Sequence, residues 1–439
     1  MGNNCRFLVI TWMWTLLGIF GYCHGDPFEV LTKNTFFLDD RVTTDLVTLT
    51  VPSAVVKGTE HQWMWTSHDG RNSNASIATI TLSMNNKPSC NIQPPFIEIT
   101  GYNPSMKPII ENAGIFVLMQ TKPPYAILAR FEVFGFAFKG TPLFEGNKMF
   151  LGADVSVSCE VSRLPEGATL QLTFQEEPTS NSALFFNNTV HKVIRSVDQN
   201  YQGTCNLKLN ENNTFVISIQ MYVLKGTYLS PMLTLFRESS NNSKVKMMCW
   251  SHYKVNYQKA DWIKTRSAEE TPISLIGESM DEVGRDRFSY PIFNGKYFPL
   301  NISPVAFNDG GYYKCYFDTH VFAAFKLTTI QVSASRDPAG GRPLVLRCEV
   351  SEVIGDSVTL AWLRMDGSMG LLVKQEVLTE NHPNRSLSLT LPSLHMDQLH
   401  WQCAVFTMGM LRASVPLILP GATVSSELPE PIDSTSQMR

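Results

Sequence analysis

The segment Asp309-Gly-Gly-Tyr-Tyr-Lys-Cys315 is the clearest indication of the fold, because Asp397-Gln-Leu-His-Trp-Gln-Cys403 repeats its spacing. Each stretch follows an earlier cysteine and a tryptophan 13 or 14 residues after it: Cys249 and Trp262 before the first, Cys348 and Trp362 before the second. When two sheets pack face to face, a disulfide can join them, an indole packs against it, and an aromatic residue two positions before the second cysteine closes a corner. The repeated pattern therefore predicts two disulfide-linked β-sandwiches.

The flanking residues alternate as the strands of a half-buried sheet require. Leu344, Leu346 and Cys348 are separated by Arg347 and Glu349. Successive side chains of a strand point to opposite faces of the sheet, so this order places the apolar side chains inward and the charged ones outward. The segment is predicted to be an antiparallel strand with one face in a core.

The first half of the chain repeats this organisation with one cysteine pair missing. Val51 and Leu118 stand where the two cysteines would be, 67 residues apart, against 66 for the pair that ends at Cys315. Either Trp63 or Trp65 fills the core-tryptophan position, and the sequence leaves this choice open. Losing the crosslink removes a contribution of about 2–4 kcal/mol to stability.

A shorter repeat lies between these segments. Its cysteines, Cys159 and Cys205, are only 46 residues apart. Leu172 takes the tryptophan position, and Gly203 stands where the corner aromatic should be. This repeat departs most from the pattern, so its strands are the hardest to assign.

These motifs resemble those of immunoglobulin-like domains. Their long, short, long, short order is similar to the branch of that superfamily that holds the T-helper-cell coreceptor and its lymphocyte-activation-gene relative. The resemblance implies an all-β fold of four tandem immunoglobulin-like β-sandwiches (V-like, C2-like, V-like, C2-like) after a signal peptide. The implied segments are a signal peptide at 1–25, a V-like domain without its inter-sheet disulfide at 26–137, a C2-like domain at 138–228, a V-like domain at 229–335, a C2-like domain at 336–420 and a polar tail or stalk at 421–439.

The same resemblance implies specific contacts within the sandwiches. Arg287 lies where variable-type domains carry an arginine, which would form an ion pair with Asp309. The implied disulfides are Cys159–Cys205, Cys249–Cys315 and Cys348–Cys403. The residues expected to build the cores and corners are Trp63, Trp65, Trp262, Trp362, Arg287, Asp309, Tyr313, Asp397 and Trp401.

The N-terminus has the order of a secretory signal. Arg6 precedes a 14-residue apolar run at 7–20, and Cys23 and Gly25 then provide the small residues of a cleavage site before Asp26. The apolar run is short for a membrane-spanning helix, which is the alternative. The 439 residues contain no second candidate span, and a polar tail ends them, so the sequence as written predicts an exported chain.

Cysteines and glycosylation signals agree with export. Seven of the nine cysteines follow the signal, so Cys90 is left over from three pairs. We place it in an exposed polar loop, where it could link two chains as a homodimer, stay partly buried and unpaired, or carry a small thiol. Six Asn-x-Ser/Thr acceptors are candidate glycan sites: Asn74, Asn187, Asn212, Asn241, Asn301 and Asn384.

Composition and motifs argue against other classes of function. A net charge of −3 and 44% hydrophobic residues exclude a basic nucleic-acid-binding chain and a disordered one. The sequence contains no phosphate-binding loop, dinucleotide fingerprint or zinc spacing, so we expect no cofactor, no metal site and no catalytic residues. The histidines are interpreted as solvated or locally hydrogen-bonded, and the chain is not expected to be an enzyme.

Hairpin loops between the last two strands of a sandwich are the candidate binding sites. In the first domain this hairpin is Lys122-Pro123-Pro124-Tyr125, a stiff turn that presents an aromatic side chain of the kind enriched at interfaces. The hairpins 320–322 and 408–410 are weaker candidates, and all three could be ordinary turns.

The sequence therefore predicts an extracellular recognition protein, with a protein ligand or receptor on another cell as its partner. The resemblance implies cell adhesion or T-cell costimulation at the leukocyte surface. The alternatives are a secreted decoy or structural protein without signalling, or a truncated gene model of a single-pass receptor. An anchored form would place the chain on the external side of the plasma membrane.

Overall fold

A computed structural model describes most of the chain between residues 33 and 419. The described ranges are 33–39, 46–51, 60–82, 88–100, 102–123, 125–141, 147–175, 183–209, 214–224, 232–251, 259–265, 273–275, 286–335, 343–352, 357–380, 384–391 and 400–419. Strands dominate these residues, joined by the short 3₁₀ turns η2 (Ile110–Asn112) and η3 (Phe307–Asp309). Within them, no helix is long and apolar enough to cross a membrane. The expected signal peptide and polar tail lie outside the described residues.

The chain forms two compact units. The first contains Met1–Phe136 with Val161–Arg163 and is called domain 1. The second contains Ala137–Glu160 with Leu164–Arg439 and holds domains 2, 3 and 4. Strand β9 (Ala126–Thr141) runs through the predicted junction at 137/138, and β24 (His320–Ser335) reaches the predicted junction at 335/336.

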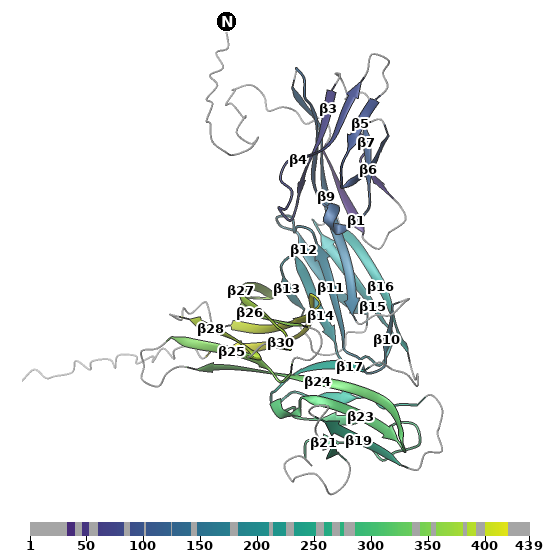
Figure 1. The fold of residues 1–439 in the computed structure, drawn as a ribbon, viewed down its shortest axis with the longest axis vertical. Helices are drawn as coiled ribbons and strands as arrows, with labels where there is room; N and C mark the ends of the chain where they lie inside the picture. The colour runs from purple at the N-terminus through teal and green to yellow at the C-terminus, as the bar shows by residue number, and fades with distance from the viewer. Residues whose placement is uncertain are drawn as a thin grey trace, which may run out of the picture. The chain divides into compact units, whose positions relative to one another are not determined.

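Domain 1 is a sandwich of a large and a small sheet (Figure 1). In the large sheet, β5, β4, β3, β8 and β9 lie in that order, and β1 pairs with β9 in parallel. The small sheet has the order β2, β7, β6. The bounds are β1 (Lys33–Asp39), β2 (Val47–Thr48), β3 (Glu60–Ser67), β4 (Ala75–Leu82), β5 (Pro88–Ile92), β6 (Phe96–Thr100), β7 (Asn103–Met106) and β8 (Gly114–Gln120).

Strand register settles which tryptophan occupies the core position of domain 1. Trp63 on β3 lies opposite Leu118 on β8, as Trp262 lies opposite Cys315 and Trp362 opposite Cys403. The Trp63 ring is fully buried and packs edge-on against that of Phe96, with 5.8 Å between ring centroids. Leu118 therefore fills the position of the missing second cysteine with apolar volume.

Domain 2 is also built from two sheets, and the residue at its tryptophan position again lies opposite the second cysteine. One has the order β13, β14, β11, and the other β10, β16, β15, β12. The bounds are β10 (Lys148–Phe150), β11 (Val155–Val161), β12 (Thr169–Gln175), β13 (Leu184–Phe186), β14 (Thr189–Ile194), β15 (Tyr201–Lys208) and β16 (Thr214–Leu224). Leu172 lies opposite Cys205, so it occupies the tryptophan position as predicted. A side chain at Gly203 would meet the rings of Phe138 and Phe174 within 2.9 Å, which explains why the corner aromatic is absent.

Domain 3 repeats the two-sheet plan of domain 1. Strands β20, β19, β23 and β24 form one sheet with β17 parallel to β24, and β18, β22 and β21 form the other. The bounds are β17 (Leu233–Glu238), β18 (Val245–Met247), β19 (Ala260–Thr265), β20 (Ile273–Ser274), β21 (Phe288–Ser289), β22 (Leu300–Ile302) and β23 (Gly311–Phe317). Leu300 and Ile302 are fully buried and Asn301 between them is not, so β22 turns one face toward the core and the acceptor Asn301 away from it.

Domain 4 begins on the strand that ends domain 3. The last residues of β24, from Ile330, pair with β25, and β28 follows in the same sheet. The second sheet has the order β30, β29, β26, β27. The bounds are β25 (Leu344–Val350), β26 (Val358–Asp366), β27 (Met369–Leu378), β28 (Ser386–Leu391), β29 (His400–Thr407) and β30 (Met410–Ile418). The predicted junction at 335/336 is thus reached by continuous strand, and the residues that follow it, 336–342, lie outside the described residues.

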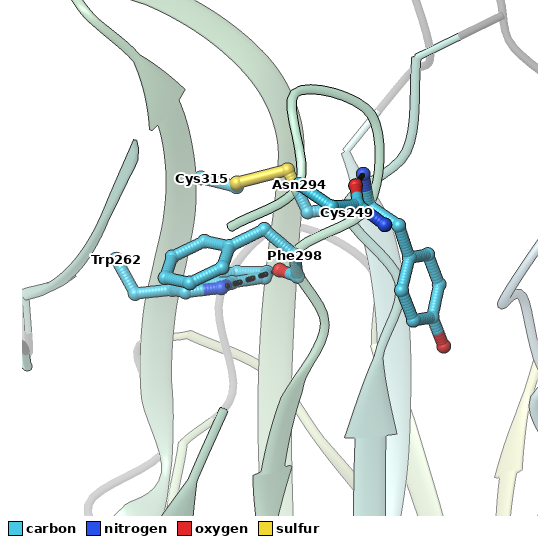
Figure 2. Close-up of a disulfide and its surroundings, with 6 residues drawn as sticks. Cys249, Trp262, Asn294, Phe298 and Cys315 are labelled. Carbon is cyan, nitrogen blue, oxygen red and sulfur yellow. Dashed lines mark hydrogen bonds between the residues drawn. A yellow bond between two sulfur atoms is a disulfide. The ribbon is translucent and has the colours of Figure 1, made fainter. Parts of the chain in front are cut away.

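The cores have the immunoglobulin-like arrangement of cystine and tryptophan. The three predicted disulfides are present, one in each of domains 2, 3 and 4. In Figure 2 the indole of Trp262 lies beside the Cys249–Cys315 disulfide and donates from Nε1 to the carbonyl oxygen of Phe298 at 2.9 Å. Trp362 makes the equivalent bond to Leu387 at 3.2 Å. The chain is therefore an all-β protein of tandem immunoglobulin-like sandwiches.

Two local predictions were wrong. Cys90 lies on strand β5, in register with Ile80 of β4, and not in a loop, because the polar segment around it satisfies its backbone through sheet hydrogen bonds. His61 and His191 are buried and not solvated. His61 lies on the buried face of β3 together with Trp63 and Trp65, whereas every residue of β14 around His191 is buried.

Candidate recognition surfaces

The corner of domain 3 shows how the framework holds its loops. Arg287 contacts Asp309 with both terminal nitrogens, at 2.5 and 3.1 Å, as the resemblance implied. The hydroxyl of Tyr313 donates to the carbonyl oxygen of Asp309 at 2.5 Å. Both contacts fix the turn before β23. The equivalent Asp397 of domain 4 lies outside the described residues, whereas Trp401 is buried beside Trp362.

The β8–β9 hairpin of domain 1 presents the aromatic residue that we singled out. Tyr125 is 67% exposed. The base of the hairpin is fixed, because Gln120 donates from Nε2 to the carbonyl oxygen of Lys122 at 3.0 Å and Lys122 Nζ lies 2.9 Å from Glu60. Hydrogen bonds from Lys122 and Thr121 hold the pKa of Glu60 below its ordinary value. Pro123 follows in the turn, and Pro124 lies outside the described residues.

The two weaker hairpins each lose one of the residues that made them candidates. In domain 3, Phe322 is buried against Phe317, with ring centroids 4.3 Å apart, so only its neighbours in the turn face solvent. In domain 4, Met410 is buried whereas Met408 is 73% exposed. Tyr125, Val321 and Met408 therefore remain as exposed apolar or aromatic side chains at the three hairpins.

An extensive contact that the sequence did not predict joins domains 2 and 4. The outward face of the β30–β29–β26–β27 sheet lies against the outward face of β13 and β14 (Figure 1). Domain 2 contributes Leu184 and Val193 to the buried apolar cluster there. Domain 4 contributes Ala361, Leu363, Ala404, Phe406 and Leu411. This contact covers β26, β29 and β30 on the four-stranded face of domain 4 that sandwich domains commonly offer to partners, whereas β27 is mostly exposed.

Hydrogen bonds also join domains 2 and 4 around this apolar cluster. Ser156 donates from Oγ to the carbonyl oxygen of Leu411 at 2.5 Å, and Arg412 donates to the carbonyl oxygen of Thr141 at 3.3 Å. The backbone nitrogen of Phe185 donates to the carbonyl oxygen of Ser368 at 3.3 Å. The last bond joins β13 to the turn before β27, so the two sheets are linked at their edges.

A cavity of about 420 Å³ remains beside the apolar cluster. Domain 2 lines it with Ser158, Asn187, Thr189 and His191, and domain 4 with Phe406 and the hairpin 408–410. The Lys139–Glu160 ion pair, 2.9 Å between Nζ and Oε2, lies at its border. The cavity thus combines apolar side chains with amide, hydroxyl and imidazole groups.

His191 is one of the buried polar groups that line this cavity. Only 6% of the residue is exposed, and its ring lies edge-on to Phe406 with 5.7 Å between centroids. Burial lowers the pKa of His191 to about 4, so the imidazole is neutral near pH 7. Its Nδ1 has no hydrogen-bond partner among the described residues.

One signal in the sequence could have revealed the domain 2–domain 4 contact. Residues 360–363 read Leu-Ala-Trp-Leu and residues 403–406 read Cys-Ala-Val-Phe, with no polar side chain on either face. A strand covered on one side alternates between apolar and polar residues, whereas an unbroken apolar run marks a strand covered on both. The sequence thus contained evidence that a second layer covers domain 4, although it did not identify domain 2 as that layer.

The glycan acceptors occupy turns and strand faces. Asn74 and Asn187 lie in turns with positive φ, Asn241 in an exposed turn, and Asn301 on β22. Asn384 precedes β28 and is exposed, whereas Asn212 lies outside the described residues. Asn187 is distinguished from the others because it borders the domain 2–domain 4 cavity.

Comparisons with known proteins find likeness in structure only. No family model matches the chain, and no curated protein matches it. The N-terminal four Ig domains of Dscam1 isoform 6.9 are 14% identical, cover 90% of this chain and 98% of that chain, and give a TM-score of 0.22. Extracellular domains 3–5 of Drosophila OTK are 16% identical in sequence. The match covers 68% of this chain and 94% of that chain, with a TM-score of 0.21. The titin I-band fragment I67–I69 is 11% identical in sequence. The match covers 69% of this chain and 97% of that chain, with a TM-score of 0.18. At such scores the fold assignment rests on the strand pairing and disulfides described above.

Proposed function

We propose that this chain is an exported recognition protein that binds a protein on the surface of another cell through domain 1. The observation that carries the proposal is the Lys122–Tyr125 hairpin, whose exposed aromatic tip stands on a base fixed by Gln120 and Glu60. Exposed tyrosines on ordered turns lose little conformational entropy on binding and are enriched at interface hot spots.

Three features support export. Disulfides persist in oxidising compartments and are rare in the cytosol, and three of the four sandwiches contain one. The N-terminal apolar run has the order of a secretory signal. The acceptors Asn241 and Asn384 are exposed, so glycans attached to them would remain in solvent.

The finer part of the proposal is a role at the leukocyte surface in adhesion or costimulation. It is supported by the duplicated order of long and short domains, which is similar to that of the T-helper-cell coreceptor branch. Binding at such a surface requires no catalytic group, and we assign none.

The test uses the complete chain with a C-terminal tag, expressed in cultured animal cells. We expect it in the medium or on the cell surface, with glycans attached. The purified chain, made multivalent on a streptavidin carrier, should then stain a subset of leukocytes, and trypsin treatment of those cells should abolish staining. Retention inside the expressing cells, or staining that trypsin does not reduce, would contradict the proposal.

A further inference from the structure

We propose that the cavity between domains 2 and 4 holds the first N-acetylglucosamine of a glycan attached to Asn187, and that this sugar joins the two domains. The inference rests on the export that the proposed function requires, and it assigns the cavity a covalently attached occupant.

The acceptor stands at the cavity itself. Asn187 and Asn188 form the two-residue turn between β13 and β14, both with positive φ, as in a tight hairpin. Thr189 completes the acceptor motif Asn187-Asn188-Thr189. Asn187 and Thr189 both line the cavity. A sugar attached to the Asn187 amide therefore begins at the border of the cavity.

The lining suits an amphipathic sugar. A cavity of about 420 Å³ is far larger than one water requires and lies within the range of small-molecule sites. The rings of Phe186 and Phe406, 6.1 Å apart, and the exposed Met408 provide apolar surface for one face of the pyranose. The Nδ1 atom of His191 has no partner among the described residues and could bond a hydroxyl or the acetamido group.

Attachment precedes folding, so the buried Thr189 does not prevent it. The amide Nδ2 of Asn187 forms a bond to C1 of the sugar, the bond from C1 to a lipid diphosphate donor breaks, and the amide proton is lost. The diphosphate leaves with the electron pair. Folding then brings domain 4 against the hairpin that carries the sugar.

The experiment measures how fast each glycan is released from the folded chain. The complete chain is made in cells that keep their glycans in the high-mannose form. It is then treated under native conditions with an endoglycosidase that cuts between the first two N-acetylglucosamines. Release at Asn187 should be slower by about tenfold or more than at Asn241, which lies in an exposed turn away from the cavity, because cleavage must wait for the domains to open. After unfolding, the two sites should be cut at equal rates.

A variant tests the contact without threatening the fold. Met408 is 73% exposed, so Met408→Ser should leave the fold of domain 4 intact while it speeds release at Asn187. Val321→Ser, on the corresponding hairpin of domain 3, is the matched control. It should change the rate of glycan release neither at Asn187 nor at Asn241. Asn187→Gln should lower the temperature at which domains 2 and 4 unfold, whereas Asn241→Gln should not.

The outcomes separate the two proposals. Equal native release at Asn187 and Asn241, or a bare Asn187 on a chain that carries glycans elsewhere, would overturn this inference alone. A chain with no glycan at any acceptor would overturn both the inference and the proposed export.

Discussion

Arg237 and Asp154 form a buried ion pair that links domain 3 to domain 2. Arg237 lies on β17 and Asp154 directly before β11, and both are almost fully buried. The guanidinium contacts both carboxylate oxygens, with Nη2 2.9 Å from Oδ1. The backbone nitrogen of Ser196 also donates to Asp154 Oδ1 at 3.0 Å, so the carboxylate is bonded from both domains. The pair therefore sets how the two domains meet.

Removing the carboxylate should be costly. In Asp154→Ala, Arg237 would remain buried without its counter-charge, close to the half-buried Arg195, whose pKa is lowered by burial and by Arg237. Breaking one partner of such a pair typically costs about 3–5 kcal/mol, so calorimetry should show domains 2 and 3 unfolding at a clearly lower temperature. Glu349→Gln removes the exposed Arg347–Glu349 pair and should cost about 1 kcal/mol or less. Similar losses of stability in Asp154→Ala and Glu349→Gln would contradict the structural role that we assign to the buried pair.

The corner of domain 3 predicts a difference between neighbouring tyrosines. Tyr313→Phe deletes the hydroxyl that donates to Asp309 and leaves a buried carbonyl oxygen without this donor, at a cost of about 1–3 kcal/mol in the free energy of unfolding. Tyr312→Phe alters a half-buried ring on the opposite face of β23 and should cost much less. Urea unfolding of the two variants checks this, and an equal effect would contradict it.

The buried histidine predicts that the domain 2–domain 4 contact weakens in acid. Since burial lowers the folded-state pKa of His191 from 6.5 to about 4, its stabilising effect is present above pH 6.5 and is lost as the pH falls toward 4. A shift of this size corresponds to about 3 kcal/mol across that interval.

Unfolding temperatures measured at pH 7 and at pH 4.5 provide the check. His191→Gln should reduce the difference between them, whereas His320→Gln, at an exposed position in domain 3, should preserve it. An unchanged pH dependence in His191→Gln would show that other groups carry it.

Domain 1 should accept the disulfide that its sequence lacks. Val51 and Leu118 are buried at the positions where the other domains have cystines. The double variant Val51→Cys and Leu118→Cys should form a crosslink that stabilises domain 1 by about 2–4 kcal/mol. Mass spectrometry under non-reducing conditions detects the crosslink, and two free thiols in the folded chain would show that our alignment of the strands is incorrect.

Much of the fold followed from the repeated spacing and from the resemblance that it supports. The resemblance implied the cysteine pairs and the Arg287–Asp309 contact, and alignment of the repeats placed Leu172. All of these depend on residues within one sandwich. The choice between Trp63 and Trp65 did not follow, because both are buried and only strand register distinguishes them.

Contacts between domains could not be predicted in the same way. The Arg237–Asp154 pair joins residues 83 positions apart in different sandwiches, and no local pattern marks either of them. The apolar runs in β26 and β29 indicated a covered face, but any of several surfaces could have covered it. The structure shows that β26, β29 and β30 of that face pack on domain 2.

The most direct test of the account is the affinity of the complete multivalent chain for the cells it stains, measured for Tyr125→Ser and for Ile292→Ser. Ile292 is 95% exposed in domain 3, so its variant controls for loss of an apolar surface group. The account predicts that Tyr125→Ser loses about 2 kcal/mol or more, roughly thirtyfold in affinity, while Ile292→Ser binds as the unaltered chain does. Unchanged binding by Tyr125→Ser, or an equal loss in both variants, would contradict recognition through the domain 1 hairpin.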